Sequence, residues 1–328
     1  MSVKIKDIAK KLNISSGTVS KGLNGASDIS YELTQLILDT AIEMGYTPKK
    51  MRKQDNKKLC IFITNMNYKS KKDFGYDIIL GFKKHAIREN FEVFIEEINP
   101  QFQNQNYYDT YMLSKGYRGS FFMGFSLNDT WINQLNNTTI PTVLLDNYIL
   151  KNFNVSYVGT DNFEAFDISV KHLVNLGHSK IGFFSGSQES MIKTERYEAF
   201  LKAMQNYNIN VNEELISYGN YSSESAKNHI PKIIENGASA ILCSSDLMAY
   251  GAIKVCNELG LNVPNDISII GFDDIDIAKE NDITTIKQNR LEIGKCAYIA
   301  LEGLMRNVCI SKTTLRPLLI KRNSVAKN

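Results

Sequence analysis

The opening of the chain, KIKDIAKKLNISSGTVSKGLNG from residue 4, places its apolar residues with the period of short helices. A first helix is indicated by apolar positions at i, i+3, i+4 and i+7, which fall on one helix face, before the pattern stops at Asn13. A second short helix follows, capped by Ser15 or Ser16 and ended at Asn24. The apolar positions are Ile5, Ile8, Ala9 and Leu12 in the first helix, and Val19 and Leu23 in the second.

A third helix is predicted between Ser30, its expected N-cap, and Gly45, its expected C-cap. Three short helices with so brief a connection between the first two predict a helix-turn-helix, in which the second helix of the pair enters the DNA major groove. A solvated three-helix cap without a ligand is the plainer alternative. The apolar stripe of the third helix is Leu33, Ile37, Ala41 and Met44.

The second helix of the pair carries small polar and basic side chains. Hydroxyl and ammonium groups at its start and outer face can reach base edges, whereas Ser20 and Asn24 are better placed for phosphates. The candidate DNA contacts of the headpiece are Lys6, Ser16, Gly17, Thr18, Ser20, Lys21 and Asn24.

Charge is unevenly distributed along the chain. Residues 1–58 hold 11 Lys and Arg against 6 Asp and Glu, whereas the remainder is slightly acidic. A small basic piece on a near-neutral body indicates a polyanionic partner, with nucleic acid as the first candidate.

From Leu59 onward, short apolar runs alternate with amphipathic stretches, which predicts βα repeats, mostly parallel sheets and helices on both faces. The runs form two series, so we expect two α/β lobes with a cleft between them. The expected strands are LCIFIT, FEVFIEE, GSFFMG and TVLLD in the first series, and VSYVGTDN, KIGFFSG, ELISYG, SAILCS and DISIIGFDD in the second.

The 328 residues, 43% of them hydrophobic, are enough for a sizeable core and more than one domain. Five scattered cysteines without a CxxC pair argue against a zinc or redox motif, and four histidines show no metal spacing. No nucleotide-binding glycine motif and no nucleophile elbow occurs, so neither a cofactor nor an enzymatic activity is expected. A charged start and the absence of a long apolar run predict a cytoplasmic protein without a membrane contact.

Aspartates recur at the ends of apolar strands, at Asp146, Asp246 and Asp273. In parallel α/β sheets, ligands bind beyond the carboxyl ends of the strands. Carboxylates together with an arginine, Arg196, suit vicinal hydroxyls, and Phe74 or Tyr221 suits the apolar face of a sugar or base. Each residue also has a structural alternative, since an aspartate after a strand often caps the next helix, an arginine can be a surface ion-pair residue and a tyrosine can fill the core.

The quoted headpiece and the segment DISYELTQLILDTAIEMGYTP resemble the DNA-binding headpiece of the lactose-repressor (LacI/GalR) family, through Pro48. The segments VSYVGTDNFEAFDISVKHLVNLGHSKIGFFSG, ERYEAFLKAM, SSDLMAYGAIKVCNELGLNVPNDISIIGFDD and TTIKQN resemble the effector-binding core of the same family. The resemblance implies an α/β protein with a three-helix headpiece and a two-lobed, periplasmic-binding-protein-like core. Its implied parts are a headpiece (1–48), a basic linker (49–58), and lobes at 59–155 with 286–310 and at 156–285 with 311–328, with crossovers near Val155 and Thr285.

The resemblance also implies roles for the candidate effector residues. Asp146 matches the family's aspartate after the fourth strand, and Arg196 matches its sugar-contacting arginine. Asp273 matches the first aspartate of its G-[FY]-D-D element, and Asp246 matches the Asn/Asp that precedes LMA. Tyr221 falls where relatives carry a stacking Trp or Phe, and Phe74 is a further aromatic candidate.

The linker KKMRKQDNKK has six basic residues in ten. In the resembled family this segment forms a hinge helix on DNA and inserts a leucine into the minor groove, but here that position is Asp55. Met51 can replace the wedge, since a wedge requires only shape and hydrophobicity. We favour a simpler role, in which lysines such as Lys49 and Lys50 attract phosphates.

The sequence therefore predicts a homodimeric transcription regulator, a repressor, that binds a palindromic operator and is controlled by a small metabolite, with a sugar favoured. A purine or a phosphorylated carrier protein is an alternative effector within the resemblance. Outside it, the alternatives are a sugar-binding protein without regulatory DNA binding and an enzyme acting on a sugar or nucleoside.

Replacing Lys49 and Lys50 together by alanine is expected to make operator binding less salt-dependent. Each phosphate contact contributes a slope of about −0.9 to log K against log salt, so losing two contacts reduces the slope by about 2. Fluorescence anisotropy with a labelled duplex at several salt concentrations measures this slope. The pair Lys83→Ala plus Lys84→Ala is the control, and an unchanged slope in the linker variant contradicts the phosphate role.

Overall fold

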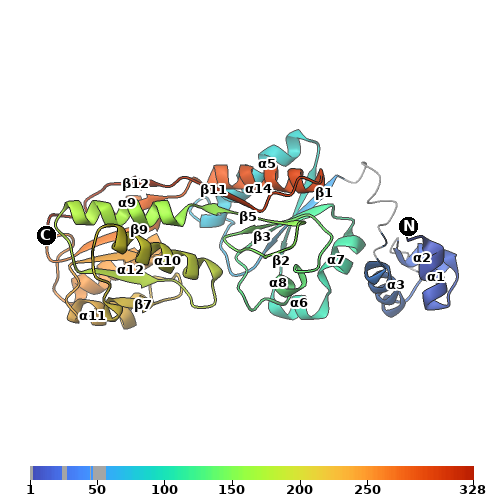
Figure 1. The fold of residues 1–328 in the computed structure, drawn as a ribbon, viewed down its shortest axis with the longest axis horizontal. Helices are drawn as coiled ribbons and strands as arrows, with labels where there is room; N and C mark the ends of the chain where they lie inside the picture. Colours follow the sequence, from blue (N-terminus) through green and yellow to red (C-terminus); the bar gives the residue numbers. More distant parts are fainter. Residues whose placement is uncertain (1–2, 24–27, 45, 47–56) are drawn as a thin grey trace. The chain divides into compact units, whose positions relative to one another are not determined.

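The structure, a computed structural model, describes residues 3–23, 28–44, 46 and 57–328 (Figure 1). Four candidate DNA contacts, Asn24, Lys49, Lys50 and Met51, lie outside the described residues. The chain divides into two compact units. Unit 1 comprises Met1–Asn65, Phe82–Tyr157 and Lys295–Lys312, and unit 2 comprises Met66–Gly81, Val158–Gly294 and Thr313–Asn328.

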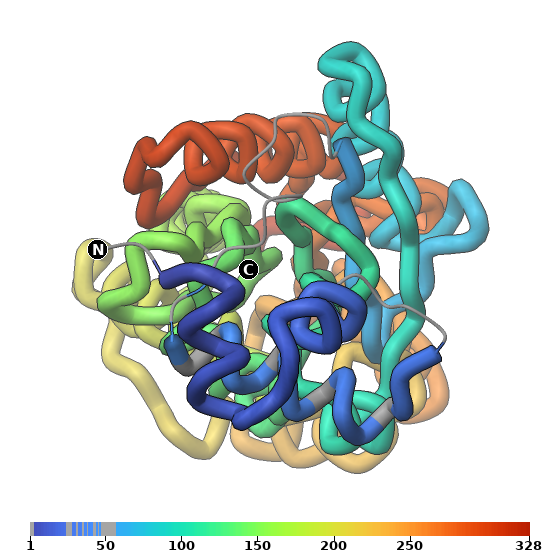
Figure 2. The backbone as a smooth tube through the Cα atoms, turned by 90° about the vertical axis from the view of Figure 1, so that its right-hand side faces the viewer, coloured from blue at the N-terminus to red at the C-terminus, as the bar shows by residue number. Residues whose placement is uncertain are grey.

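The N-terminal part of unit 1 folds into the three predicted helices, α1 (Ile5–Leu12), α2 (Ser16–Leu23) and α3 (Tyr31–Glu43), drawn as the blue tube in Figure 2. Ser15 is the cap of α2, because its Oγ accepts a hydrogen bond from the Thr18 backbone N–H at 3.0 Å. The expected cap of α3 is confirmed, since Ser30 Oγ accepts from the Leu33 N–H at 3.2 Å.

The headpiece has its own hydrophobic core. All the apolar positions expected from the periodicity pack in it, together with Val3, Ile14 and Tyr46. Helix α2 lies very close to α3 at Gly22, where a Cβ atom would stand 2.6 Å from Ile37 Cδ1. The glycine therefore sets the distance between the two helices. The fully buried members are Ile8, Val19, Ile37 and Ala41.

The first sheet has the strand order β11-β5-β4-β3-β1-β2, and its β1–β2, β1–β3 and β3–β4 pairs are parallel. One face is covered by an aromatic cluster around Trp131, and on the other Phe82 of α5 stacks on Phe121 of β3 at 5.4 Å. Its elements are β1 (Lys58–Ile63), α5 (Phe74–Arg88), β2 (Glu92–Glu97), α6 (Pro100–Gln105), α7 (Tyr108–Lys115), β3 (Gly119–Met123), α8 (Thr130–Gln134), β4 (Thr142–Leu145), β5 (Val155–Thr160), α14 (Arg290–Met305) and β11 (Lys312–Leu315).

The second sheet has the order β12-β10-β9-β8-β6-β7. Its β6–β7, β6–β8, β8–β9 and β9–β10 pairs are parallel, and its β10–β12 pair is antiparallel. Successive residues alternate between two cores: Phe183 packs with α9 and α10, and Phe184 packs with α11 and α12. Its elements are α9 (Asn162–Asn175), β6 (Ile181–Ser185), α10 (Met191–Asn206), a 3-10 turn (Glu213–Leu215), β7 (Ile216–Tyr218), α11 (Ala226–Glu235), β8 (Ala240–Cys243), α12 (Asp246–Glu258), β9 (Ser268–Asp273), α13 (Asp276–Glu280), β10 (Thr284–Lys287) and β12 (Leu318–Ile320).

The mixed α/β class with parallel sheets agrees with the sequence. The alternating pattern gave no indication of α13, β10, α14, β11 or β12; of these, the three strands and α13 have only three to five residues each. The compact units group residues 66–81 and 286–294 with unit 2, whereas the expected lobe boundaries placed both segments with the first lobe. Among the described residues, no helix is long and apolar enough to cross a bilayer.

The C-terminal tail is fixed to unit 2 by buried hydrogen bonds. His178, 4% exposed, contacts the Ala326 carbonyl through Nε2 and Ser239 Oγ through Nδ1, each at 3.0 Å. The carbonyl can only accept, so Nε2 carries the proton and Nδ1 accepts from the serine. Burial lowers the pKa of His178, although the bond to Ala326 opposes that shift.

This lowered pKa predicts a loss of stability in mild acid. Below about pH 6.5, the usual histidine pKa, the unfolded chain binds a proton that the folded chain resists, so the free energy of unfolding falls as the pH falls. His178→Gln keeps a donor for Ala326 and should reduce the fall of Tm between pH 7.5 and 5.5. Thermal melts of both proteins across this range test it; an equally steep fall in the variant contradicts it.

Candidate functional site

The DNA-facing candidates lie on the outer side of α2. Ser16, Gly17 and Lys21 are exposed, while Val19 and Gly22 of the same helix are buried. Lys21 forms an ion pair with Asp28, and this contact lowers the pKa of the Asp28 carboxyl. The predicted DNA contact of Lys21 would replace this ion pair with a contact to a base or phosphate. The face therefore has the shape and polarity of a recognition surface.

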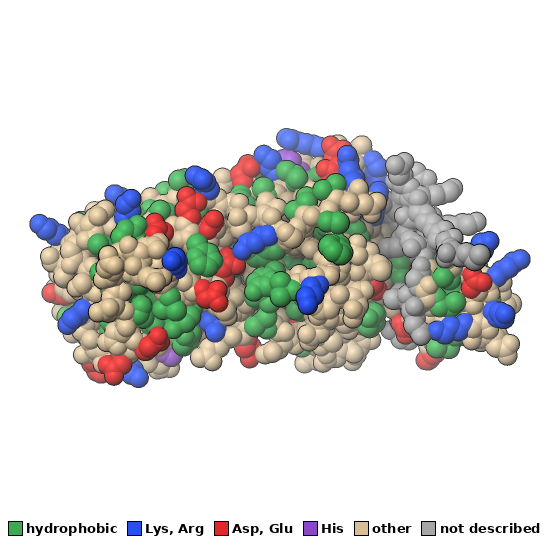
Figure 3. Space-filling model, in the orientation of Figure 1, with side chains coloured by type: hydrophobic (Ala, Val, Ile, Leu, Met, Phe, Trp, Pro, Cys, Tyr) green, Lys and Arg blue, Asp and Glu red, His purple; other side chains and the backbone are tan. Residues whose placement is uncertain are grey.

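The other described headpiece candidates are less exposed, except for one lysine. Lys6 on α1 is exposed, and Thr18 and Ser20 are half-buried. Thr18 Oγ1 lies 2.9 Å from Ser15 Oγ, so its hydroxyl takes part in the cap as well. Figure 3 shows Lys and Arg side chains on the headpiece surface, in keeping with a polyanionic partner.

In unit 2, strands β6, β8, β9 and β10 run parallel, so their carboxyl ends share one edge of the sheet. Asp273 lies at this edge, at the end of β9, and its Oδ1 accepts a hydrogen bond from Gln288 Nε2 at 2.7 Å. The side-chain amide oxygen of Gln288, Oε1, in turn accepts a hydrogen bond from Thr160 Oγ1 at 2.5 Å. The side chain of Gln288, just beyond β10, therefore fixes Asp273 relative to the end of β5.

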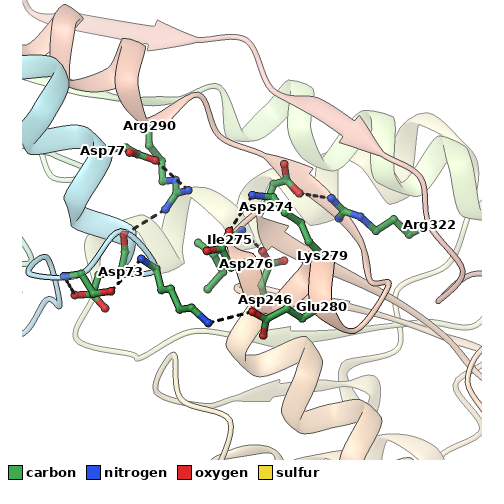
Figure 4. Close-up of polar contacts among 12 residues, drawn as sticks. Asp73, Asp77, Asp246, Asp274, Ile275, Asp276, Lys279, Glu280, Arg290 and Arg322 are labelled. Atoms are coloured by element: carbon green, nitrogen blue, oxygen red, sulfur yellow. Dashed lines mark hydrogen bonds and ion pairs between the residues drawn. The ribbon is translucent and has the colours of Figure 1, made fainter.

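Asp246 is fully buried rather than presented to a ligand (Figure 4). Its Oδ1 accepts from Thr285 Oγ1 at 2.5 Å, and its Oδ2 accepts from the Ile275 N–H at 2.8 Å. Burial and the neighbouring Asp273 raise its pKa well above the usual range. Ser245, not Asp246, caps α12. The geometry thus gives Asp246 a positioning role for the corner after β9.

The second aspartate of that corner, Asp274, also has its carboxylate bound by another side chain of the protein. It forms an ion pair of 2.6 Å with Arg322 from the C-terminal tail, and both side chains are largely buried (Figure 4). A second nitrogen of Arg322 donates to the Ile283 carbonyl at 2.8 Å. This pair joins the tail to the edge of the sheet.

Arg196 of α10 is 4% exposed and lies at the same edge. Its Nε donates to Asn162 Oδ1 at 3.1 Å, its Nη1 donates to the Ser244 carbonyl at 2.7 Å, and its guanidinium lies 4.0 Å from the centre of the Phe272 ring. The side chain is therefore held rigidly, and Nη2 is the nitrogen that remains for a ligand.

Tyr221 adopts a left-handed backbone, with φ 66°, and its ring covers Gly186 just after β6. A Cβ atom at Gly186 would lie 2.0 Å from Tyr221 Cζ, so only glycine leaves room for the ring. The Tyr221 hydroxyl lies 3.4 Å from Ser190 Oγ. The aromatic ring is thereby fixed at the carboxyl edge.

Phe74 begins α5, and its segment belongs to unit 2. Arg290 holds this turn at two points: its Nη2 lies 3.2 Å from Asp77 Oδ2, and its Nη1 lies 3.3 Å from the Asp73 carbonyl (Figure 4). Arg290 and Gln288 were not expected from the sequence. Both residues follow strand β10. The end of this strand could have indicated site residues, but the strand has only four residues and is hard to recognise from the sequence.

Asp146 lies in unit 1, at the end of β4, half-buried and with φ 53°. Five of the six effector candidates therefore belong to unit 2, and Asp146 belongs to unit 1. Three of the six, Asp146, Tyr221 and Asp273, have positive φ, a conformation that concentrates at functional sites because it must be supported by its surroundings. Within the described part of the chain, no cluster of His, Cys, Asp or Glu could hold a metal ion.

A three-helix headpiece with a recognition surface, joined to α/β units whose strand ends gather polar side chains, defines a DNA-binding protein of the ligand-controlled kind. Residues 4–49 match the bacterial regulatory proteins of the lacI family, and residues 170–325 match the periplasmic binding protein-like domain. The chain thus carries the helix-turn-helix domain of the lacI family together with a periplasmic binding protein-like domain.

Curated relatives of similar length are transcriptional repressors. The HTH-type transcriptional repressor PurR of Actinobacillus pleuropneumoniae serotype 3 (strain JL03) is 29% identical over 326 residues, covering 97% of this chain and 94% of the relative. The repressor CytR of Escherichia coli K12 is 28% identical over 311 residues, covering 92% and 89%. These relatives are repressors and not enzymes, in agreement with the sequence.

Solved structures share the fold. The transcriptional regulator CelR in complex with cellobiose superposes with a TM-score of 0.73 at 21% identity, covering 98% of this chain and 99% of that one. The lac repressor dimer bound to operator and the anti-inducer ONPF gives a TM-score of 0.69 at 21% identity, covering 99% and 100%. The headpiece and the binding-protein-like core thus form one recognised architecture.

The contact between Gly186 and Tyr221 yields a double-mutant test. Gly186→Ala should destabilise the protein by about 1–3 kcal/mol, because the added methyl group overlaps the ring. In a Tyr221→Ala background the same change should cost much less, since the overlap is gone. Urea denaturation of the four proteins measures this coupling, and equal costs in both backgrounds would contradict the assigned packing.

Proposed function

We propose that this protein is a repressor that binds a palindromic operator as a homodimer and is controlled by a small metabolite held at the strand ends of its core. The observation that carries the proposal is the headpiece surface, where Ser16, Gly17 and Lys21 are exposed on a helix whose opposite side is buried. A regulator of this kind acts where its DNA is, so we also propose a cytoplasmic location.

In this proposal, each of the three expected parts of the chain has its own role. Residues 1–48 read the operator, the basic linker at 49–58 adds phosphate contacts, and residues 59–328 bind effector and the second protomer. Two headpieces are needed for the two halves of a palindrome, which supports the homodimer. The lac repressor structure is described as a dimer on its operator.

For the effector, a sugar is the first candidate class. Asp273, Arg196 and Tyr221 supply a carboxylate, a guanidinium and an aromatic ring at one edge of unit 2, a set suited to a polyol. We propose Asp146 and Phe74 as further contacts and give Asp246 the role of holding the corner. A purine and a phosphorylated carrier protein are the alternative effectors within the family resemblance.

The coupling between the two ligands is expected to be reciprocal. An effector that prefers one protein conformation by about 1–3 kcal/mol changes operator affinity roughly 5- to 150-fold, and operator changes effector affinity by the same factor. Equal effector affinity with and without operator would therefore rule out this mechanism.

Selection from random duplexes tests the DNA function without knowledge of the operator. The wild-type protein should enrich a palindrome. Thr18→Ala should relax the preference at particular base pairs, by about 1–3 kcal/mol each, because a base contact is lost. Lys6→Ala should weaken binding to all sequences alike, with Lys10→Ala, an exposed lysine of the same helix, as its control. Failure to enrich any palindrome at moderate salt would overturn the proposal.

A further inference from the structure

Arg196 is a buried cation without an acidic partner. The two acceptors of its hydrogen bonds, Asn162 Oδ1 and the Ser244 backbone carbonyl, are neutral, and the Phe272 ring covers one face of the guanidinium. Among the described residues, no carboxylate forms an ion pair with it. Buried charges are normally paired, so this guanidinium lacks a counterion that a ligand can supply.

Two serine side chains at the same edge add a second, independent signal. Ser185 and Ser244 are both fully buried, and neither Oγ has a hydrogen-bond partner among the described residues. Buried hydroxyls are nearly always satisfied, so an unsatisfied pair calls for an explanation.

The sheet register places the two hydroxyls side by side. Phe184 of β6 is paired with Cys243 of β8, so Ser185 and Ser244 are the next pair, and the Ser244 N–H donates to the Phe184 carbonyl at 3.0 Å. Alternation along the strands puts both serines on the face that carries Phe183 and Leu242, which is the face packed by α10.

Arg196 lies on this same face. Phe272, against which the guanidinium stacks, belongs to the same core, and the register of β8 with β9 aligns it with Ser244. Asp246 lies on the opposite face, because its Oδ1 is the atom that a Cβ at Gly271 would meet at 2.3 Å, and Gly271 alternates with Phe272. The sheet therefore separates the guanidinium and hydroxyls from that carboxylate.

We propose that Arg196, Ser185 and Ser244 form a subsite for a negatively charged, oxygen-rich group of the effector, a carboxylate or a phosphate. Arg196 Nη2 and the two hydroxyls can all donate hydrogen bonds, and the guanidinium supplies the charge, which is the donor set that oxyanions require. The inference rests on the proposed effector function of unit 2. It narrows the proposed effector to a sugar or other small metabolite that carries a carboxylate or phosphate group.

The first measurement is the thermal stability of the protein without ligand. An unsatisfied buried hydroxyl lowers stability, so Ser185→Ala and Ser244→Ala should leave Tm unchanged or raise it. Ser324→Ala is the matched control in the same unit, because Ser324 is equally buried but donates to the Ile269 carbonyl and accepts from the Thr284 N–H. Its Tm should fall. A comparable fall in the Ser185 and Ser244 variants would overturn the subsite.

The second measurement uses inorganic phosphate and acetate as separate probes, each titrated against chloride at constant ionic strength. One of them should raise the Tm of the wild-type protein and of Ser324→Ala, and the double variant Ser185→Ala/Ser244→Ala should bind that probe at least tenfold more weakly. The preferred probe distinguishes a phosphate from a carboxylate.

A Tm that neither anion raises above the chloride control would overturn the subsite, as would equal binding by the double variant. The assay contains no DNA, so this failure leaves operator selection unaffected. Conversely, selection of no palindrome together with specific anion binding would overturn the repressor and keep the subsite.

Discussion

The backbone corner after β9 is the constraint on which the rest of the unit 2 edge depends. Asp273 and Asp274 both have positive φ, at 119° and 56°, a conformation that costs a non-glycine residue of order 1–3 kcal/mol. Three contacts support it: Gln288 holds Asp273, Arg322 holds Asp274, and Asp246 accepts from the next N–H, that of Ile275. Strands, tail and helix α12 thus converge on one turn, which orients a carboxylate outward.

The same sheet keeps the Arg196 guanidinium and the Asp246 carboxyl group on opposite faces. Its α10 face carries the guanidinium of Arg196 against Phe272, and its α12 face carries the buried Asp246 beneath Gly271. The edge therefore carries hydrogen-bond donors from one face and the ordered acidic corner at the strand end. Because the strands are parallel and in register, these groups meet at one edge although they lie far apart in the chain.

The headpiece, in contrast, is held together by interactions between residues that are close in sequence. Its core is small and continuous in sequence, and Gly22 lets α2 lie close against α3 while the opposite side of α2 stays exposed. Local capping by Ser15 and Ser30 fixes where the helices begin. Recognition therefore depends on short-range interactions here, and on long-range strand pairing in the core.

The sequence by itself determined the headpiece and the strands. Helix periodicity, caps and apolar runs are local properties, so Ile8, Val19 and Ile37 could be assigned to one core, and the strands from β1 to β9 could be located from their apolar runs. Strand-end aspartates and Arg196 could be proposed as site residues for the same reason.

Only the tertiary structure decided what each of those side chains does. Asp246 and Asp273 both end or follow apolar strands, yet one is enclosed by Thr285 and the Ile275 N–H while the other lies at the edge. The difference arises from Thr285 on strand β10 and Gln288 just beyond it, which lie far from both aspartates in the sequence. The serine pair beside Arg196 likewise depends on register between β6 and β8, which hydrogen bonding between separate strands sets and local periodicity cannot.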